Sequence, residues 1–327
     1  MTSILRRGAE SVFLFWLVVS LTFVLARLAP GEPTDLLIPP TAQAEDIAQL
    51  RRAFGLDASL AEQYARWTTR VLRGDLGRSF ATQEPVIEVV RRALPLTLGL
   101  GVVSLTLTFA IGVGAGLWQG ARAGSVGDRA LTTIEITLFA APSFWIALAL
   151  VALFTYGASR WGWPLWLRLP AMGVQTPGSD FHGWRWASDL ARHAVLPVSV
   201  LTMVGAAGVA RYARASARDL LLSDWVRTAR AKGVSPRGVM MRHVLANARP
   251  SLVVLLALSL PGTVAGSVFV ESVFAWPGMG RTMLGAIAAR DYPVVMGATL
   301  VYAALVVAAN AVSDVAVMWA DPRRRRP

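Results

Sequence analysis

The sequence predicts an all-α membrane protein with six transmembrane helices. The chain of 327 residues is 54% hydrophobic and only 16% charged, whereas soluble proteins carry about 25% charged residues. Its mean hydropathy is +0.50. Six apolar stretches are close to or above the roughly 20 residues that a helix needs to cross a bilayer. These observations favour several membrane spans over one large soluble core.

Polar segments separate the six expected spans. Arg and Lys occur in the spans only near their ends, which agrees with a cost of roughly 2.5–3.5 kcal/mol for an Arg at the centre of a membrane helix. In chain order, the expected spans are residues 12–28, 94–118, 131–156, 194–212, 252–274 and 294–319.

The distribution of basic residues predicts that both termini are cytoplasmic. The long loop after the first span contributes little to this rule, because long loops are translocated largely regardless of charge. With the termini inside, seventeen Lys and Arg residues lie in cytoplasmic segments and six in the two short outer loops. One alternative remains open: residues 24–26 resemble the cleavage site of a signal peptide, whose removal would leave five spans.

The spans divide the chain into four parts. The outer loop contains two segments of helix-like composition, 44–54 and 60–72, followed by "RGDLGRSF", which indicates a turn because its two glycines suit positive φ. We interpret this loop as a small extracytoplasmic cap without chemistry of its own. The parts are residues 1–28 with the first span, 29–92 outside, 93–320 as the core with the cytoplasmic segment 211–250, and a basic cytoplasmic tail at 321–327.

The segment between the fourth and fifth spans is strongly basic and has the pattern of two helices joined by a corner. Residues 224–232 are compatible with a helix, and Gly233 suits the left-handed residue that ends one. Ser235 is a good N-cap, and Pro236 fits the first helical position. Nine basic residues lie here: Arg211, Arg214, Arg218, Arg227, Arg230, Lys232, Arg237, Arg242 and Arg249.

Small residues in the first of these helices predict a bare patch surrounded by hydrogen-bond donors. Ala229, Ala231 and Gly233 have little side-chain bulk, so another surface can approach the backbone closely. The neighbouring basic side chains would surround that patch. Such an element suits a groove on a cytosolic partner, but composition alone equally allows a basic loop that lies on anionic lipid.

The stretches "RTARAKG" and "RHVLANARP" resemble the cytoplasmic signature of bacterial ABC-importer permeases, in the form typical of the dipeptide, oligopeptide and nickel branch. The general signature is E-A-A-x-x-x-G-x9-I-x-L-P. Gly233, Ala229 and Leu245 match it, whereas other positions resemble the peptide branch, in which R-x-A-x-A-K-G and a following His are usual. The positions that depart from the general signature are Arg227, Thr228, His243 and Ala246.

Three further stretches extend this resemblance over nearly the whole chain. They are "GDLGRSF" in the outer loop, "HAVLPVSVL" at the start of the fourth span, and "ESVFAWPGMGRTMLGAIAARDYPVVMG" at the end of the fifth span and beyond it.

The resemblance implies the type I ABC-importer permease fold in a bacterial inner membrane. The basic segment is then the coupling helix, which fits a cleft on an ATP-binding subunit. The implied partners are two such subunits, a second homologous permease and an extracytoplasmic substrate-binding protein. Peptides are the implied cargo, with nickel, glutathione and oligosaccharides left open. The implied coupling residues are Arg227, Thr228, Ala229, Ala231, Lys232, Gly233 and His243.

The sequence lacks the residues for ATP chemistry, so ATP and Mg are expected only on partner subunits. A phosphate-binding loop requires Gly-Lys-Ser/Thr, and the only lysine, Lys232, lies between alanine and glycine. Cysteine is absent, and the three histidines are far apart, so no metal or cofactor site is expected. The charge of +12 is explained by membrane orientation, and no nucleic-acid partner is expected. A secondary transporter remains an alternative, although the spans lack central charged residues.

Polar residues within the spans are candidates for the transport pathway. Asn310, Ser313 and Asp314 are spaced i, i+3, i+4 on one helical face, which predicts a buried polar seam. Glu271 lies near the outer end of the fifth span. The alternative for the carboxylates is an interfacial position paired with nearby arginines.

Overall fold

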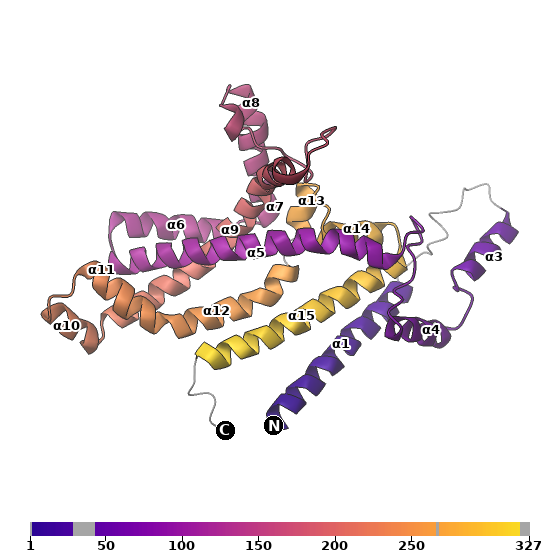
Figure 1. Cartoon of the computed structure of the whole chain (residues 1–327), viewed down its shortest axis with the longest axis horizontal. Coiled ribbons are helices and arrows are strands. Elements are labelled where there is room, and N and C mark those ends of the chain that lie inside the picture. Colours follow the sequence, from indigo (N-terminus) through magenta and orange to yellow (C-terminus); the bar gives the residue numbers. More distant parts are fainter. Residues whose placement is uncertain (1, 29–42, 266–267, 321–327) are drawn as a thin grey trace. The chain divides into compact units, whose positions relative to one another are not determined.

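The computed structural model describes residues 2–28, 43–265 and 268–320, and these residues form helices without any β-strand (Figure 1). The expected tail at 321–327 lies outside this range. In chain order the elements are α1 (Thr2–Leu28), α3 (Ala44–Ala53), α4 (Leu60–Leu72), α5 (Val86–Ala121), α6 (Val126–Ala140), α7 (Ser143–Val151), the π-helix η1 (Ala152–Gly157), α8 (Ala158–Arg160), the 3₁₀ turn η2 (Leu165–Leu167), α9 (Gly183–Leu221), α10 (Asp224–Ala231), α11 (Pro236–Gly238), the π-helix η3 (Val239–Val244), α12 (Leu245–Ala265), α13 (Val268–Val273), α14 (Met279–Ala288) and α15 (Tyr292–Ala320).

The prediction of six spans is confirmed. Within the described residues, six helices are long and apolar enough to cross a membrane. Their bounds are Ala9–Leu28, Val86–Ala121, Ser143–Arg160, Gly183–Leu221, Pro236–Gly262 and Tyr292–Trp319. The two helices expected in the outer loop are also present, as α3 and α4.

The third expected span was wrong in its boundaries, because the structure interrupts it. Helix α6 ends at Ala140, and Ala141 has an extended backbone with φ −75° and ψ 134°. Pro142 follows and occupies the N-cap position of α7. The proline ring disfavours the helical conformation of the preceding residue, which explains the break.

The helix that contains the fifth span begins much earlier than the expected span itself. Residues Pro236 to Ala265 form a continuous helical run through α11, η3 and α12, in which the junction residues Val239 and Leu245 keep helical dihedral angles. The basic segment is therefore joined to the fifth span without a break. The end of the expected span includes residues 266–267, which lie outside the described range.

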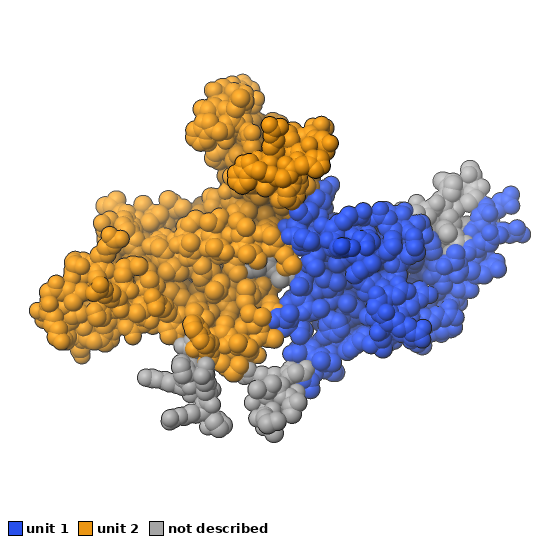
Figure 2. Space-filling view, in the orientation of Figure 1, with its two compact units in different colours: residues 1–97, 277–308 blue, residues 98–276, 309–327 orange. Residues whose placement is uncertain are grey.

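The chain forms two compact units, which Figure 2 colours separately: residues 1–97 with 277–308, and residues 98–276 with 309–327. In the first unit, the start of α5 packs against α14 and α15. The buried residues of that core are Val86, Val90, Ala93, Met279, Ala286, Val294, Val295 and Ala298.

The carboxylate of Asp291 fixes the turn "RGDLGRSF" within the first unit. It accepts hydrogen bonds from the Ser79 hydroxyl and from the Phe80 N–H at 2.9 Å. The predicted turn is confirmed, since Gly74 and Gly77 have φ of 80° and 82°. Asp291 is 3% exposed, so one buried acid satisfies donors of a turn more than 200 residues away in the sequence.

In the second unit, α5 approaches α9 closely at three glycines spaced four residues apart: Gly112, Gly116 and Gly120. A Cβ atom on Gly116 would lie 2.7 Å from Cβ of Ala213, and one on Gly120 would lie 2.7 Å from Cβ of Ala217. Small residues let membrane helices pack backbone against backbone, where dispersion takes the place of the hydrophobic effect.

We expect Gly116→Ala to destabilise the protein by roughly 1–3 kcal/mol, because the added methyl overpacks the contact between α5 and α9. Gly114→Ala is the matched control: it lies on the same helix, and nothing surrounds its added Cβ within 4 Å. The thermal unfolding midpoint of the purified protein should fall only for Gly116→Ala. Equal midpoints for the two variants would contradict the assigned contact.

Candidate functional site

Helix α10 packs on an apolar surface formed by other helices of the second unit. We call this surface, which includes Leu117 and Ala217, the platform. Val226 and Ala229, three residues apart, are 0% and 7% exposed. They pack in a cluster with Leu117 of α5 and Ala217 of α9. Spacing of three residues places both side chains on one face of the helix. The platform therefore fixes which face of α10 is left outward.

A complete Schellman motif ends α10. The N–H of Gly233 donates to the carbonyl of Arg230 at 2.9 Å, and the N–H of Val234 donates to the carbonyl of Ala229 at 3.1 Å. Gly233 has φ of 77°, so the predicted left-handed residue is confirmed.

The next helix begins as the sequence predicts. The Ser235 hydroxyl accepts from the N–H of Gly238 at 3.2 Å, and Pro236 occupies the first turn. Both sides of the corner are thus fixed by local hydrogen bonds. The corner is a defined structure and not a free loop.

The outward face of α10 and its corner is basic. The predicted patch is smaller than expected, because the side chain of Ala229 points into the platform and is buried. That correction follows from its position three residues after Val226. The exposed members of the predicted set are Arg227, Thr228, Ala231, Lys232 and Gly233, together with Arg230.

His243 lies beside the same segment. Its ring centroid is 6.2 Å from that of Trp225, at an interplanar angle of 38°, and its carbonyl accepts from the Asn247 side chain at 2.7 Å. His243 thus contributes an aromatic contact that holds the end of η3 near the start of α10.

Helix α10 is inserted between two long helices of the same unit. Helix α9 ends at Leu221, only three residues before α10 begins, and α11 begins five residues after α10 ends. Figure 1 shows α10 and α11 at one end of this unit, with α9 and α12 leading away from it. Short connections therefore link α10 to α9 and α12, which contain the fourth and fifth expected spans.

A buried ion pair ties the first short loop of this unit to α9. Arg214 Nε lies 2.6 Å from Asp128 Oδ1, and Arg214 Nη2 lies 2.8 Å from Oδ2. The Asp128 carboxylate also accepts from the N–H of Gly124 at 2.8 Å. The hydrogen bonds from Arg214 lower the pKa of Asp128 to about 2, against the opposing effect of burial.

A cavity of about 440 Å³ opens beside this pair and is lined by Thr132, Glu135, Ile136, Arg211 and Arg214. Glu135 is 6% exposed. Its Oε2 and the Oε1 of the fully buried Gln119 have no hydrogen-bond partner among the described residues. Unsatisfied buried oxygens next to a cavity are the usual surroundings of bound water.

Of the three residues predicted to form a polar seam on α15, only Ser313 is buried within this chain. Ser313 is buried, with its hydroxyl 2.6 Å from the carbonyl of Ala257 and 2.7 Å from that of Ala309, whereas Asn310 and Asp314 are exposed. Ser313 thus serves as a contact between α15 and α12. The packing direction of α15, which the sequence does not contain, decides which of the three is buried within the chain.

Glu271 is fully buried in α13. Its backbone carbonyl accepts from the N–H of Trp276 at 2.8 Å. The structure therefore places its side chain inside the second unit.

Sequence reasoning missed the Asp128–Arg214 pair, the anchoring role of Asp291 and the three packing glycines. The packing glycines could have been predicted from the sequence, because Gly112, Gly116 and Gly120 repeat at intervals of four within an apolar stretch. The roles of Asp128 and Asp291 could not be predicted in this way, since their partners are 86 or more residues away in the sequence.

Comparison with known proteins shows a match along almost the entire chain. The family model described as binding-protein-dependent transport system inner membrane component matches residues 112–326. The model for the N-terminal part of such membrane components matches residues 1–101.

Several named relatives are similar over nearly their full length. An oligopeptide transport system permease protein, AppB of Bacillus subtilis, is 34% identical over 321 residues, covering 98% of each chain. A putative peptide permease protein of Brucella ovis is 38% identical, covering 93% of this chain and 92% of the relative. A di/tripeptide transport system permease protein, DppB of Pseudomonas aeruginosa, is 34% identical, covering 98% of each chain.

We expect Asp128→Asn to destabilise the protein by about 3 kcal/mol, the lower end of the cost of unpairing a buried charge, because Arg214 is 25% exposed. Asp219→Asn is the matched control, since that carboxylate lies exposed near the end of α9. The free energy of unfolding should change for Asp128→Asn alone. A similar small effect of both substitutions would contradict a structural role for the pair.

The same pair predicts a pH dependence. The pKa of Asp128 is lower in the folded protein, about 2, than the value of about 3.9 expected in the unfolded chain. Its stabilisation is therefore fully present above about pH 4 and is lost as the pH falls towards 2. The stability difference between wild type and Asp128→Asn should be constant from pH 5 to 7 and shrink below pH 4. A stability difference between the two proteins that grows as the pH falls would contradict the assigned ion pair.

Proposed function

This chain belongs to the family of binding-protein-dependent transport system inner membrane components, and we propose that it is the permease subunit of an ATP-driven importer of peptides. The support for peptide cargo is the consistent naming of relatives that align over nearly their whole length as oligopeptide, di/tripeptide or peptide permeases. The six apolar helices supply the membrane-spanning part.

The observation that carries the mechanism is the exposed basic face of α10 on its apolar platform. Arg227, Arg230 and Lys232 are exposed there, while Val226 and Ala229 hold the other face of the helix in place. A short helix held on one side and basic on the other is suited to the groove of a cytosolic partner. We assign that partner as an ATP-binding subunit.

The proposed assembly contains two ATP-binding subunits, a second homologous permease and an extracytoplasmic substrate-binding protein. Both termini and α10 lie on the cytoplasmic side, in line with the excess of basic residues in those segments. ATP and Mg are held by the partner subunits. This chain contributes half of the translocation pathway and the coupling surface.

Coupling follows from how α10 is connected. Closure of the ATP-binding subunits on ATP moves the two α10 helices of the permease pair together. Because α10 joins α9 directly and reaches α12 through a fixed corner, this movement is passed to the fourth and fifth spans. The pathway then opens to the outside, where the binding protein delivers its peptide. A rigid connection is needed, since a flexible corner would absorb the displacement.

Transport provides the direct test of this function. In liposomes that contain the whole complex, we expect uptake of labelled peptide to require ATP on the cytoplasmic side and the binding protein on the other. Uptake by this chain alone, driven by an ion gradient, would overturn the proposal in favour of a secondary transporter.

We expect Gly233→Val to leave membrane insertion intact and to reduce ATP-driven uptake at least about tenfold. A β-branched residue at φ of 77° is strained by roughly 1–3 kcal/mol, which the segment relieves by changing the corner between α10 and α11. Uptake and ATP hydrolysis are measured together, so that uncoupling is visible as hydrolysis without uptake.

Gly178→Val is the matched control for that experiment. Gly178 has φ of 74° and open space around its Cβ position, as Gly233 has, but it lies in the loop before α9. Uptake should be close to the wild-type level in this variant. Unchanged uptake in Gly233→Val, or an equal loss in both variants, would remove the support for coupling through the corner.

A further inference from the structure

A cavity of about 720 Å³ in the first unit gathers an unusual number of arginines. Its size is in the range of small-molecule sites. It lies between the end of α1, helices α3 and α4, the turn that Asp291 fixes, and the start of α15. Its charged lining residues are five arginines, Arg27, Arg52, Arg66, Arg70 and Arg78, and a single carboxylate, that of Asp75.

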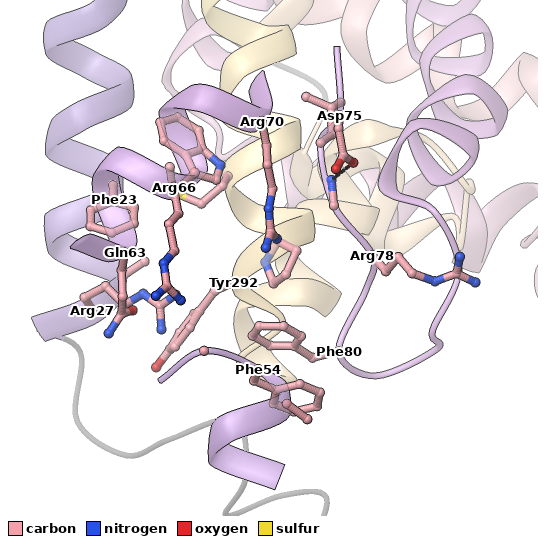
Figure 3. Close-up of a pocket in the computed structure, with 18 of the residues that line it drawn as sticks. Phe23, Arg27, Phe54, Gln63, Arg66, Arg70, Asp75, Arg78, Phe80 and Tyr292 are labelled. Atoms are coloured by element: carbon pink, nitrogen blue, oxygen red, sulfur yellow. Dashed lines mark hydrogen bonds between the residues drawn. The ribbon is translucent and has the colours of Figure 1, made fainter. Parts of the chain in front are cut away.

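Arginines outnumber acids around this cavity. The Asp75 carboxylate accepts from the N–H of Gly77 at 2.8 Å, and Arg66 pairs with Glu62, one turn earlier on α4. Arg70 has no acidic partner within the described part of the chain. Figure 3 shows Arg66 and Arg70 projecting from α4 on the side that faces Tyr292. Like charges that line one cavity raise its potential and attract an anion.

Aromatic side chains form the other part of the lining. Arg27 lies 5.1 Å from the ring centroid of Tyr292 and 5.6 Å from that of Phe23. Phe54 stacks on Phe80 with 4.1 Å between centroids. The cavity thus combines guanidinium donors with apolar surface, which suits a ligand that has an anionic group beside an apolar part.

The position of the cavity along the spanning helices identifies the class of ligand. The apolar part of α1 ends at Leu28, and that of α15 begins at Tyr292, so the cavity lies at the level of the lipid headgroups. Aromatic and basic residues are enriched at this level. The outer surface of α1 beside it is apolar, with Leu21 and Leu25 more than half exposed. That surface is available for acyl chains.

We propose that this cavity binds the phosphate-bearing headgroup of an anionic phospholipid, with Arg66 and Arg70 as its principal donors. Guanidinium groups bind phosphate oxygens in pairs of parallel hydrogen bonds. Tyr292, Phe23 and Trp67 cover the apolar side, and the acyl chains follow the exposed flank of α1. On the proposed orientation the lipid lies in the outer leaflet, where it fastens α4 to α1 and α15.

The test compares two double variants of equal charge in the intact purified transporter. Arg66→Gln with Arg70→Gln removes two cavity donors. Arg73→Gln with Arg91→Gln removes two arginines of the same unit that do not line the cavity. Each is titrated with short-chain phosphatidylglycerol and with phosphatidylcholine, and bound lipid is counted by native mass spectrometry.

We expect wild type and the Arg73/Arg91 control to prefer phosphatidylglycerol by about tenfold or more, because charge-assisted hydrogen bonds are specific to the anionic lipid. The Arg66/Arg70 variant should lose this preference. Arg66→Lys with Arg70→Lys should retain part of it, since the charges remain, and that result separates ligand binding from misfolding. An equal preference in all variants, or none in wild type, would overturn the proposal.

Two competitors separate the lipid from other anions. Displacement of phosphatidylglycerol by an equal concentration of inorganic phosphate would overturn the lipid assignment in favour of a small anion. Displacement by an equal concentration of a dipeptide would reassign the cavity to a peptide carboxylate. Lipid preference is read without transport, so a failure here is distinct from a failure of the proposed importer function.

Discussion

The close contact between α5 and α9 is the constraint on which the second unit depends. Lipid-facing helices gain no hydrophobic stabilisation from contacting one another, so their association relies on close packing. Glycines on α5 allow this packing, and the contact at Gly120 and Ala217 lies next to Leu117. Leu117 and Ala217 then form part of the platform that receives Val226 and Ala229. The contact between α5 and α9 therefore determines which face of α10 is exposed.

Local hydrogen bonds and buried charges hold the rest of the proposed coupling surface. The Schellman motif at Gly233 and the cap at Ser235 make the corner stiff without any contact to a partner. The Asp128–Arg214 pair fastens the neighbouring loop to α9. A surface that is fixed before binding loses little conformational entropy on docking, and it transmits force without deforming. Both properties are needed if ATP hydrolysis on another subunit is to move the spans.

Arginine serves several different physical purposes in this chain. In the proposed orientation, some arginines keep their segments on the cytoplasmic side by their number. Those of α10 form an exposed surface, Arg214 satisfies one buried carboxylate, and the five of the first unit surround a cavity. Only the first of these uses depends on count alone. The other three depend on which groups the fold places together. Arg214 stabilises the fold by pairing with Asp128, whereas the arginines gathered around the cavity form the proposed lipid site.

The sequence by itself determined the fold class, the six spans, the helices of the outer loop and the corner at Gly233, because hydropathy, capping residues and glycine act over a few neighbouring positions. The tertiary structure decided what depends on distant partners. It buried Ala229, exposed Asn310 and Asp314, joined Asp291 to the turn at Ser79, and gathered five arginines around one cavity. Local patterns show that a helix has two faces, but only packing against residues far away in the chain selects which face is covered.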